Sequence, residues 1–476
     1  MHPITVSMDH LRAAFAPLSK VIGHRTTLPA LSHLKLERTE NRLAITATDL
    51  DRYLTFTCQL EPDPITPLGR MLAEIRWKRA AGSILVPRSV LQSAIKSGAT
   101  EATFAEGEMS YAVTGTTVRI PFDAIAVREF PVTPAASTSS FAEFDAEHRR
   151  WLMEAARFSS ADATRYVLNG VYLDVSSDAG RFVATDGRRL YVRAAPGLAG
   201  LSESCILPSW SVNLLGTAAL LAQDWKLGIG KVQVGEGESA ELVDYGVLSA
   251  GPWNLVTKLI EGNYPNYHQV IPDELSQPPL SLWATVPIGC AAHRILVDLL
   301  AKLPPPDGGS PSALLRFHAG HLEVTCASPR SSFAVPNVTS DAPIAIAFDR
   351  RFLLDSLSIG PGILRLADSQ TPGLYTSGTA INVLMPLRSE SPPSIHDPEL
   401  EAALAPWEGK EVEYDDSSGT VIGGVRSGLR IYARVESHVP GAGRANIPFG
   451  QLKLLADKAP MPPTTTKKPK RQLAAA

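Results

Sequence analysis

Three aspartates are the residues whose types and spacing could most readily carry out chemistry. Asp49 and Asp51 stand two positions apart after a strand-like run, and Asp186 ends FVATD much as Asp49 ends AITATD. Paired carboxylates can act as general acid and base or bind a divalent metal, so an Asp-based, metal-dependent nuclease is one hypothesis. Asp186 follows an apolar pattern of its own. This favours separate structural copies over convergence on one catalytic site.

Other signatures of catalysis or metal binding are missing. The sequence contains no G-x-x-x-x-G-K-[ST], H-E-x-x-H or G-x-S-x-G motif. GIGKV (228–232) lacks the spacing and the hydroxyl of a phosphate loop, and we interpret it as a hairpin turn. The four cysteines lie far apart without a C-x-x-C pair, which predicts core thiols. We therefore expect no enzyme activity, no cofactor and no metal.

An internal repeat explains why the Ala-Thr-Asp ending occurs twice. Residues 31–49 and 168–186 align without a gap, and each predicts a β-hairpin because apolar and polar residues alternate with period two. Upstream, residues 11–21 and 148–158 carry the stripe of an amphipathic helix. A weaker third copy pairs a helix-like stretch with a hairpin. The corresponding segments are 288–303 and 313–328, and further helices are predicted at 88–98, 209–223 and 350–360.

The length of 476 residues predicts three or four domains, and Pro-rich joints at 129–137, 263–279 and 389–399 suggest where they meet. We predict an α+β protein of three repeated domains followed by a C-terminal extension. Its parts are domains at 1–137, with an insertion at about 62–79, 138–272 and 273–390, a small β-rich extension at 391–458, and a disordered basic tail at 459–476.

Charge and hydropathy narrow the choice of partner and compartment. The formal net charge of −3 excludes a general polycation, so any contact with nucleic acid must use a local arrangement of Lys and Arg. No apolar run approaches the roughly 20 residues that span a bilayer, and the first residues lack the apolar core of a signal peptide. We expect a cytoplasmic protein with no membrane partner.

Four stretches, in the same order, resemble the bacterial DNA polymerase III beta-subunit (sliding clamp, processivity factor) family. They are RTTLPALSHLKLE with LAITATDLD, RYVLNGVYLD with FVATDGRRL, NYPNYHQVIP, and VLMPLR. The resemblance covers about residues 1–388. It implies three DNA-clamp domains per chain, with helices inside and antiparallel sheets outside, and a head-to-tail homodimer closed as a ring around double-stranded DNA. Such a ring tethers a polymerase for processive synthesis.

A sliding ring must attract phosphates without reading bases, because base-specific hydrogen bonds would stop it at particular sequences. Equivalent basic positions recur on the predicted helices of the first two repeats. By helix position we assign DNA binding to Arg12, Lys20, Arg149, Arg150 and Arg157, and the resemblance adds Arg25, Arg165 and Tyr166. Arg88, at the start of a predicted second helix, completes the predicted set. One departure weakens this surface: where the family begins its second helices with basic residues, this chain has Arg88-Ser89 and Ser209-Trp210.

The resemblance also implies a pocket for short hydrophobic peptides of the DNA polymerase III catalytic subunit, the clamp loader and repair proteins. A pliable methionine and a few polar groups in an apolar cleft suit such peptides. The implied pocket residues are Leu168, Thr185, Gly187, Arg188, Arg189, Leu190, Pro265, Gln269, Val270, Val383, Leu384, Met385, Pro386, Leu387 and Arg388.

A divergent clamp paralogue is the alternative within the same family. It would bind partners as a scaffold without loading efficiently on DNA. The weak charge at the second helices and the 88 residues that follow Arg388 motivate this hypothesis.

Overall fold

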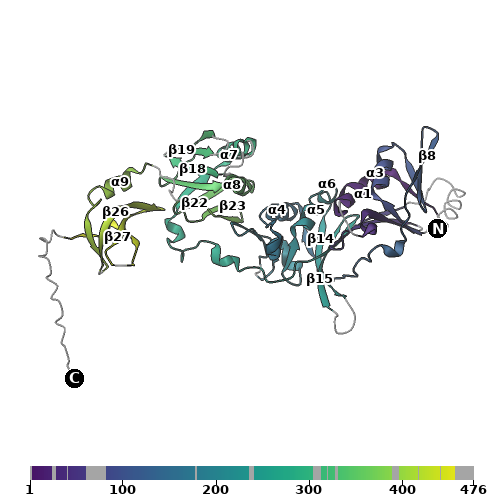
Figure 1. Ribbon diagram of the computed structural model, residues 1–476, viewed down its shortest axis with the longest axis horizontal. Helices are drawn as coiled ribbons and strands as arrows, with labels where there is room; N and C mark the ends of the chain where they lie inside the picture. The colour runs from purple at the N-terminus through teal and green to yellow at the C-terminus, as the bar shows by residue number, and fades with distance from the viewer. Residues whose placement is uncertain are drawn as a thin grey trace, which may run out of the picture. The chain divides into compact units, whose positions relative to one another are not determined.

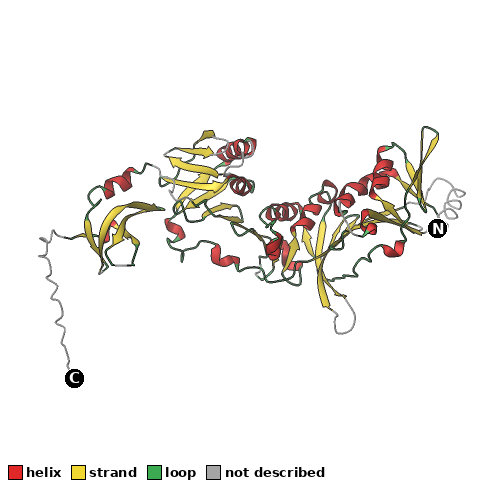
Figure 2. Cartoon of the chain, viewed as in Figure 1, coloured by secondary structure: helices red, strands yellow, loops and turns green. Residues whose placement is uncertain are grey.

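The structure is a computed structural model. It describes residues 3–23, 28–39, 41–60, 82–176, 179–234, 241–303, 312–318, 320–326, 331–388, 396–415, 417–439 and 441–455. The chain forms two compact units (Figure 1). The first contains Met1–Ile271, Asp355–Gly360 and Tyr375–Leu384, and the second contains Pro272–Leu354, Pro361–Leu374 and Met385–Ala476. Helices combine with antiparallel sheets throughout the described residues, which confirms the predicted α+β class (Figure 2). The predicted domain boundaries remain predictions.

The first repeat begins the first unit. Its elements are β1 (Ile4–Ser7), α1 (Met8–Val21), η1 (Pro29–Ser32), β2 (His33–Arg38), β3 (Arg42–Thr48), β4 (Arg52–Gln59), β5 (Gly82–Pro87), α3 (Arg88–Lys96), β6 (Glu101–Ala105), β7 (Glu108–Val113), β8 (Thr116–Pro121) and η2 (Val127–Glu129). Ser7 caps α1 by accepting a hydrogen bond from the Asp9 amide, and Leu11, Leu18 and Val21 are buried. The predicted helix at 11–21 is confirmed. The predicted insertion at 62–79 lies outside the described residues.

The second repeat continues the same unit. Its elements are β9 (Ala142–Phe144), α4 (Ala146–Ala156), η3 (Ala163–Leu168), β10 (Gly170–Asp174), β11 (Arg181–Thr185), β12 (Arg189–Ala194), η4 (Pro196–Gly200), β13 (Cys205–Pro208), α5 (Ser209–Leu215), α6 (Ala218–Leu221), β14 (Trp225–Val234), β15 (Glu241–Ala250), β16 (Trp253–Lys258) and η6 (Tyr267–Val270). The single helix predicted at 209–223 is wrong. α5 ends at Leu215 with Gly216 as its C-cap, and α6 begins after Thr217, so two short helices take the place of one.

One sheet joins the two repeats. Its strand order is β5-β2-β3-β4-β16-β15-β14-β9, and β4 pairs antiparallel with β16 at its centre. Each repeat therefore supplies a half-sheet of four strands. A separate sheet of order β1-β6-β7-β8 belongs to the first repeat, and β8 is its outer strand. Among the described residues, β8 pairs only with β7.

The interpretation of GIGKV as a turn is wrong, because these residues lie inside β14. The chain segment before β9 crosses this strand closely. A side chain at Gly228 would collide with Thr138, and a Cβ at Gly230 would lie 3.0 Å from the amide nitrogen of Ser137. The two glycines permit this close backbone approach, which is a different use of glycine from a reversal of the chain.

The third repeat contributes mainly to the second unit. Its elements are η7 (Leu280–Leu282), β17 (Ala284–Ile288), α7 (Cys290–Lys302), β18 (Ser312–His318), β19 (His321–Cys326), β20 (Ser331–Pro336), β21 (Ile344–Asp349), α8 (Arg350–Leu357), β22 (Gly362–Leu366), β23 (Gly373–Ser377) and β24 (Ala380–Leu384). A sheet of order β20-β19-β18-β21 has β20 as its outer strand, and β17 pairs with β22. In the first unit, β24 pairs with β12.

The C-terminal extension forms a sheet of order β28-β27-β26-β25-β29. Its elements are α9 (Pro398–Leu404), β25 (Glu411–Tyr414), β26 (Ser417–Ser427), β27 (Arg430–Ser437), β28 (Arg444–Pro448), η8 (Phe449–Gln451) and β29 (Lys453–Leu454). Val412, Val421 and Val435 centre its own hydrophobic core. The β26–β27 turn docks within the second unit, where the Leu429 amide donates to the carbonyl of Leu282 at 2.8 Å. The predicted basic tail lies outside the described residues.

A buried ion pair holds α9 onto β26 in this extension. Arg426 donates from Nε to Oδ2 of Asp397 at 2.6 Å, and the side chains are only 8% and 7% exposed. Burial alone would raise the pKa of Asp397, but the hydrogen bonds from Arg426 and from the Leu400 amide outweigh it, so the pKa is lowered. Asp397 therefore stabilises the folded extension above its unfolded pKa of about 4.

We expect this stabilisation to be lost as the pH falls through the lowered pKa of Asp397, because protonation removes its charge. The extension should then unfold in acid at a higher pH in Asp397→Asn than in the wild-type chain. Intrinsic fluorescence of Trp407, which packs against the core of the extension, can follow the transition. Glu408→Gln, at an exposed site, is the matched control. Identical acid transitions in Asp397→Asn and wild type would contradict the prediction.

Candidate functional site

The two Ala-Thr-Asp endings form the same turn. In the first repeat the Thr48 hydroxyl accepts from the amide of Leu50 at 3.0 Å, and Asp49 accepts from the amide of Arg52 at 2.8 Å. In the second repeat Thr185 accepts from Gly187 at 3.0 Å and Asp186 accepts from Arg189 at 3.0 Å. Leu50 and Gly187 both have positive φ, at 80° and 85°. These aspartates therefore shape turns in two copies of one structure.

Each of these aspartates also binds the arginine three residues later. Arg52 Nη2 lies 2.6 Å from Asp49 Oδ2, and Arg189 Nε lies 3.0 Å from Asp186 Oδ2. Each arginine also donates a hydrogen bond to a residue of another helix, α5 for Arg52 and α8 for Arg189. Arg52 donates to the main-chain carbonyl of Trp210 at 3.1 Å, and Arg189 donates to Asp355 at 2.6 Å. The carboxylates thus orient arginines at the contacts between repeats.

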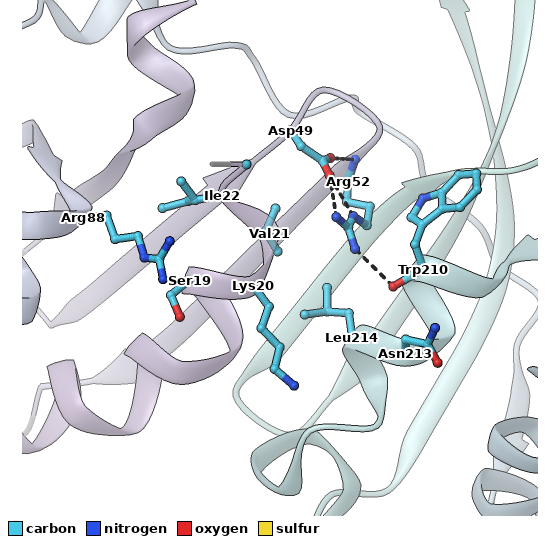
Figure 3. Close-up of a pocket in the computed structure, with 11 residues that line it drawn as sticks. Ser19, Lys20, Val21, Ile22, Asp49, Arg52, Arg88, Trp210, Asn213 and Leu214 are labelled. Carbon is cyan, nitrogen blue, oxygen red and sulfur yellow. Dashed lines mark hydrogen bonds and ion pairs between the residues drawn. The ribbon is translucent and has the colours of Figure 1, made fainter. Parts of the chain in front are cut away.

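A positively charged pocket of about 580 Å³ lies around the first of these contacts (Figure 3). The end of α1, the β3–β4 turn and the starts of α3 and α5 line it. Figure 3 shows Arg52 between Asp49 and the main chain of Trp210. Lys20 and Arg88, both predicted to contact DNA, line this pocket, and the indole of Trp210 is 40% exposed. Three cations and one carboxylate give the lining of the pocket a net positive charge.

The sequence predictions missed Arg52 and Trp210 as residues of this pocket. A signal for Arg52 was present, because it occupies the same position in the first repeat as Arg189 in the second. Trp210 was predicted only to stand where the family has a basic residue and this chain does not. Nothing in the local sequence predicts that its carbonyl accepts a hydrogen bond from an arginine 158 positions away.

The other predicted DNA-binding residues differ in their exposure and in the partners of their side chains. Arg12, Arg150 and Arg157 are exposed. Arg12 pairs with Asp9 at 2.9 Å, and Arg150 pairs with Glu154 at 3.5 Å and with Glu147 at 3.8 Å. Arg149 is only 11% exposed and is bound to Asp224 at 3.0 Å, with its guanidinium 6.0 Å from the ring centroid of Trp225. The guanidinium of Arg149 is therefore already engaged by the protein. Arg25 lies outside the described residues.

Arg165 and Tyr166 lie beside the second turn. Both are exposed, and Arg165 donates from Nη1 to the carbonyl of Asp186 at 3.3 Å. A Cβ at Gly187 would lie 2.7 Å from that same Nη1 atom, so the glycine makes room for the arginine. The residues predicted for DNA binding and for partner binding therefore meet at this turn.

The predicted partner pocket has a buried base and an exposed rim in the first unit. Leu168, Leu190, Val383 and Leu384 are at most 8% exposed, and Leu190 pairs with Val383 across β12 and β24. Five further predicted residues of this unit are exposed, with Val270 at 56%. They are Gly187, Arg188, Pro265, Gln269 and Val270. Thr185 is partly buried, and its hydroxyl donates to the carbonyl of Arg189 at 2.7 Å.

The remaining predicted pocket residues belong to the second unit. Met385 is 40% exposed and Arg388 is exposed, whereas Pro386 is buried. The amide of Leu387 donates to the carbonyl of Ala347 at 2.7 Å, which holds this segment beside β21. Hydrogen bonding to a neighbouring strand thus fixes the backbone that carries Met385.

A buried tyrosine fixes the segment that carries Gln269 and Val270. The Tyr267 hydroxyl donates to Asp174 at 2.6 Å, and this side chain is 5% exposed. Burial, followed by the hydrogen bond to Asp174, raises the pKa of Tyr267 to about 12. The hydroxyl therefore stays protonated at neutral pH and donates to the carboxylate. This anchors η6 on β10 and leaves Gln269 and Val270 exposed.

The described residues contain no group of three or more His, Cys, Asp or Glu side chains that could hold a metal ion. All four cysteines are free. Cys326 is buried, and Cys58 and Cys205 are partly buried, but Cys290 is exposed at the start of α7, so the prediction of a core thiol is wrong there. None of the helices in the described part of the chain has the length and apolar character needed to cross a membrane.

Comparison with known proteins relates most of the chain to one family. Residues 2–131 match the N-terminal domain of the DNA polymerase III beta subunit, and residues 145–266 match its central domain. The beta sliding clamp of Caulobacter vibrioides is 26% identical over 408 residues, which cover 81% of this chain and 99% of that protein. The beta sliding clamp of Escherichia coli is 30% identical over 275 residues, covering 56% of this chain and 67% of that protein.

Solved structures have the same fold. The DnaN sliding clamp of Bartonella birtlesii, bound to griselimycin, matches with a TM-score of 0.64 and 22% identity, covering 82% of this chain and all of that one. The sliding clamp of Bacillus subtilis matches with a TM-score of 0.63 and 18% identity over the same share. With the two domain matches and the repeated turns, these relatives establish that the chain belongs to the DNA polymerase III beta subunit family of sliding clamps.

Proposed function

We propose that two copies of this chain close head to tail into a ring that encircles duplex DNA and tethers a polymerase. The observation that carries the proposal is the pattern of half-sheets. Within the chain, two half-sheets join through β4 and β16 to make one sheet of eight strands. In the half-sheets that end in β8 and β20, each of these strands has only one strand partner among the described residues, so its outer edge is unpaired there. Pairing β8 of one copy with β20 of the other would complete two further eight-stranded sheets.

The DNA contact in this proposal is electrostatic. Lys20 and Arg88 would attract phosphates in the charged pocket, with Arg157, Arg165 and Tyr166 as further contacts. Phosphate contacts hold a duplex without reading its sequence, which permits sliding. Arg12, Arg52 and Arg150 would contribute less because carboxylates already pair with them. The partners are Asp9 for Arg12, Asp49 for Arg52, and Glu147 and Glu154 for Arg150. Arg149 is assigned a structural role, because its guanidinium donates hydrogen bonds to Asp224 and to the carbonyl of Phe144.

The partner contact is proposed at the surface near the second turn. Short hydrophobic peptides of the DNA polymerase III catalytic subunit, the clamp loader or repair proteins would bind over Leu168, Leu190 and Val270 of the first unit. The exposure of Val270, at 56%, supports this proposal. No catalytic step is assigned, because Asp49 and Asp186 each form an ion pair with an arginine.

A partner-binding paralogue that loads poorly on DNA is a second candidate function. Trp210, 40% exposed, stands in the charged pocket where the family resemblance implies a basic residue. Loss of one cation from each chain would weaken phosphate attraction in both halves of a ring.

Molar mass in solution tests the ring. Light scattering across a dilution series should give about twice the 51.0 kDa chain mass for the full chain. A chain ending at residue 390 should also be dimeric, because the extension contacts η7 and the end of β22 and forms no strand pairing with β20 within the described structure. Retention on nicked circular DNA, with release on linearisation, would then distinguish a ring from a scaffold. A monomer at all concentrations would refute the closed ring.

A further inference from the structure

One face of the C-terminal extension carries an alternation of basic and aromatic residues. Arg430, Tyr432 and Arg434 occupy alternate positions of β27, and Ala433 and Val435 between and beside them are fully buried in the core of the extension. Successive side chains of a strand point to opposite sides of its sheet. Arg430, Tyr432 and Arg434 therefore lie together on the outer side, which we name the Arg-Tyr face.

The neighbouring strands extend this face. Tyr432 is paired with Val425 on β26 and with Pro448 on β28, so apolar groups flank the tyrosine ring on both sides. Arg434 is paired with Gly423, which has no side chain, and with Asn446, a neutral hydrogen-bonding residue. Ile422, at the irregularity between Val421 and Gly423, is 38% exposed. The face thus combines cations with a small apolar platform.

The charge of the Arg-Tyr face is not neutralised by the protein. Within the described residues, Arg430 and Arg434 form no ion pair and no side-chain hydrogen bond. Three glutamates lie on the same side of the sheet. Glu436 is paired with Arg444 at 3.4 Å and Glu411 with His438 at 2.9 Å, and Glu413 lies on β25, which β26 separates from β27. Arg426, in contrast, is buried and bound by Asp397 and Glu399. Two exposed or partly exposed guanidinium groups therefore remain to attract an anionic ligand.

We propose that the Arg-Tyr face binds single-stranded DNA. Proteins that bind single strands without sequence preference combine cations along the backbone with an aromatic ring on which a base stacks. Here Arg430 and Arg434 would bind successive phosphates, and a base would stack on Tyr432. Unpaired bases offer their faces to a tyrosine, whereas a duplex keeps them stacked on each other. An acidic peptide would satisfy the arginines but leaves the aromatic and apolar part of the face unused.

The proposal does not depend on ring closure, because every residue of this face lies in the extension. Direct binding of the full chain to fluorescein-labelled oligo(dT) of about 20 nucleotides, followed by anisotropy, tests it. The double variant Arg430→Ala/Arg434→Ala should bind at least about tenfold more weakly. Its slope of log affinity against log salt should be shallower by about 1.4, since each lost phosphate contact on a single strand removes about 0.7.

Lys410→Ala/Lys453→Ala is the matched control, because it removes two exposed cations near the opposite edge of the sheet, at β25 and β29. It should leave the salt slope within about 0.3 of the wild-type value. Thermal unfolding of each variant establishes that the extension is folded. Equal losses in the two double variants would overturn the assignment to this face and indicate a general effect of net charge.

Variants of Tyr432 test the stacking contact. Tyr432→Phe should retain oligo(dT) affinity within about twofold, whereas Tyr432→Ala should lose about fivefold or more. Equal affinity for Tyr432→Ala and Tyr432→Phe would overturn the stacking role. Tighter binding of poly-glutamate than of oligo(dT), or unchanged oligo(dT) affinity in Arg430→Ala/Arg434→Ala, would overturn the single-strand proposal as a whole.

Discussion

Replacing Arg189 by methionine is expected to lower the free energy of unfolding of the first unit by about 2–3 kcal/mol. The guanidinium is 7% exposed and donates to Asp186 at 3.0 Å, to Asp355 at 2.6 Å and to the carbonyl of Arg157 at 2.6 Å. It also lies 4.8 Å from the ring centroid of Phe158. Methionine would preserve much of the packing but leave two carboxylates without their cation. The partial exposure of Asp355, at 32%, places the expected loss at the lower end for buried pairs.

Thermal unfolding monitored by circular dichroism measures this effect, and a loss of this size should lower the midpoint by about 5–10 °C. Arg188→Met is the matched control, because the same substitution is made one residue earlier at an exposed side chain. It should change the free energy of unfolding by less than about 0.5 kcal/mol. The unfolding midpoint of Arg189→Lys should lie between those of Arg189→Met and Arg188→Met, because a lysine keeps the positive charge but lacks the several hydrogen-bond donors of a guanidinium group. Equal midpoints for the methionine variants would contradict the proposed network.

Replacing Thr117 by proline is expected to convert the proposed dimer into a monomer. Thr114 and Gly115, with φ of 48° and 82°, form the two-residue turn between β7 and β8. Thr116 is therefore hydrogen-bonded to Val113, and the next residue along β8 points its amide away from β7. Proline at Thr117 would remove a donor that pairing with β20 of a second copy requires, while the hydrogen bonds of β8 to β7 remain.

A ring of two chains contains two such interfaces, so the substitution removes two hydrogen bonds. At about 1 kcal/mol each, the dimer dissociation constant should rise at least about 30-fold, and the pyrrolidine ring should also block the close approach of the strands. Light scattering across a dilution series measures the change. Thr117→Ala keeps the amide and should remain dimeric at the same concentrations. A dimer of unchanged stability in Thr117→Pro would refute the pairing of β8 with β20.

The local elements of this protein could be predicted from its sequence because their signals lie between near neighbours. The apolar spacing of residues 11–21 predicts a helix, and α1 covers it. The hairpins predicted at 31–49 and 168–186 are formed by β2 with β3 and by β10 with β11. The family resemblance added a fold that the comparisons confirmed. Each of these inferences uses the periodicity or order of residues close in the chain.

Contacts over long sequence separations were decided by the tertiary structure. Gly228 and Gly230 look like turn residues until the segment around Thr138 is placed across β14. Arg52 looks like a solvated strand residue, yet it is 158 positions from the carbonyl that accepts its hydrogen bond. Local hydrogen bonding and side-chain periodicity are encoded by neighbours within a few residues. The pairing of one repeat with the next depends on shape and on the satisfaction of buried polar groups, which exist only once the sheets have packed.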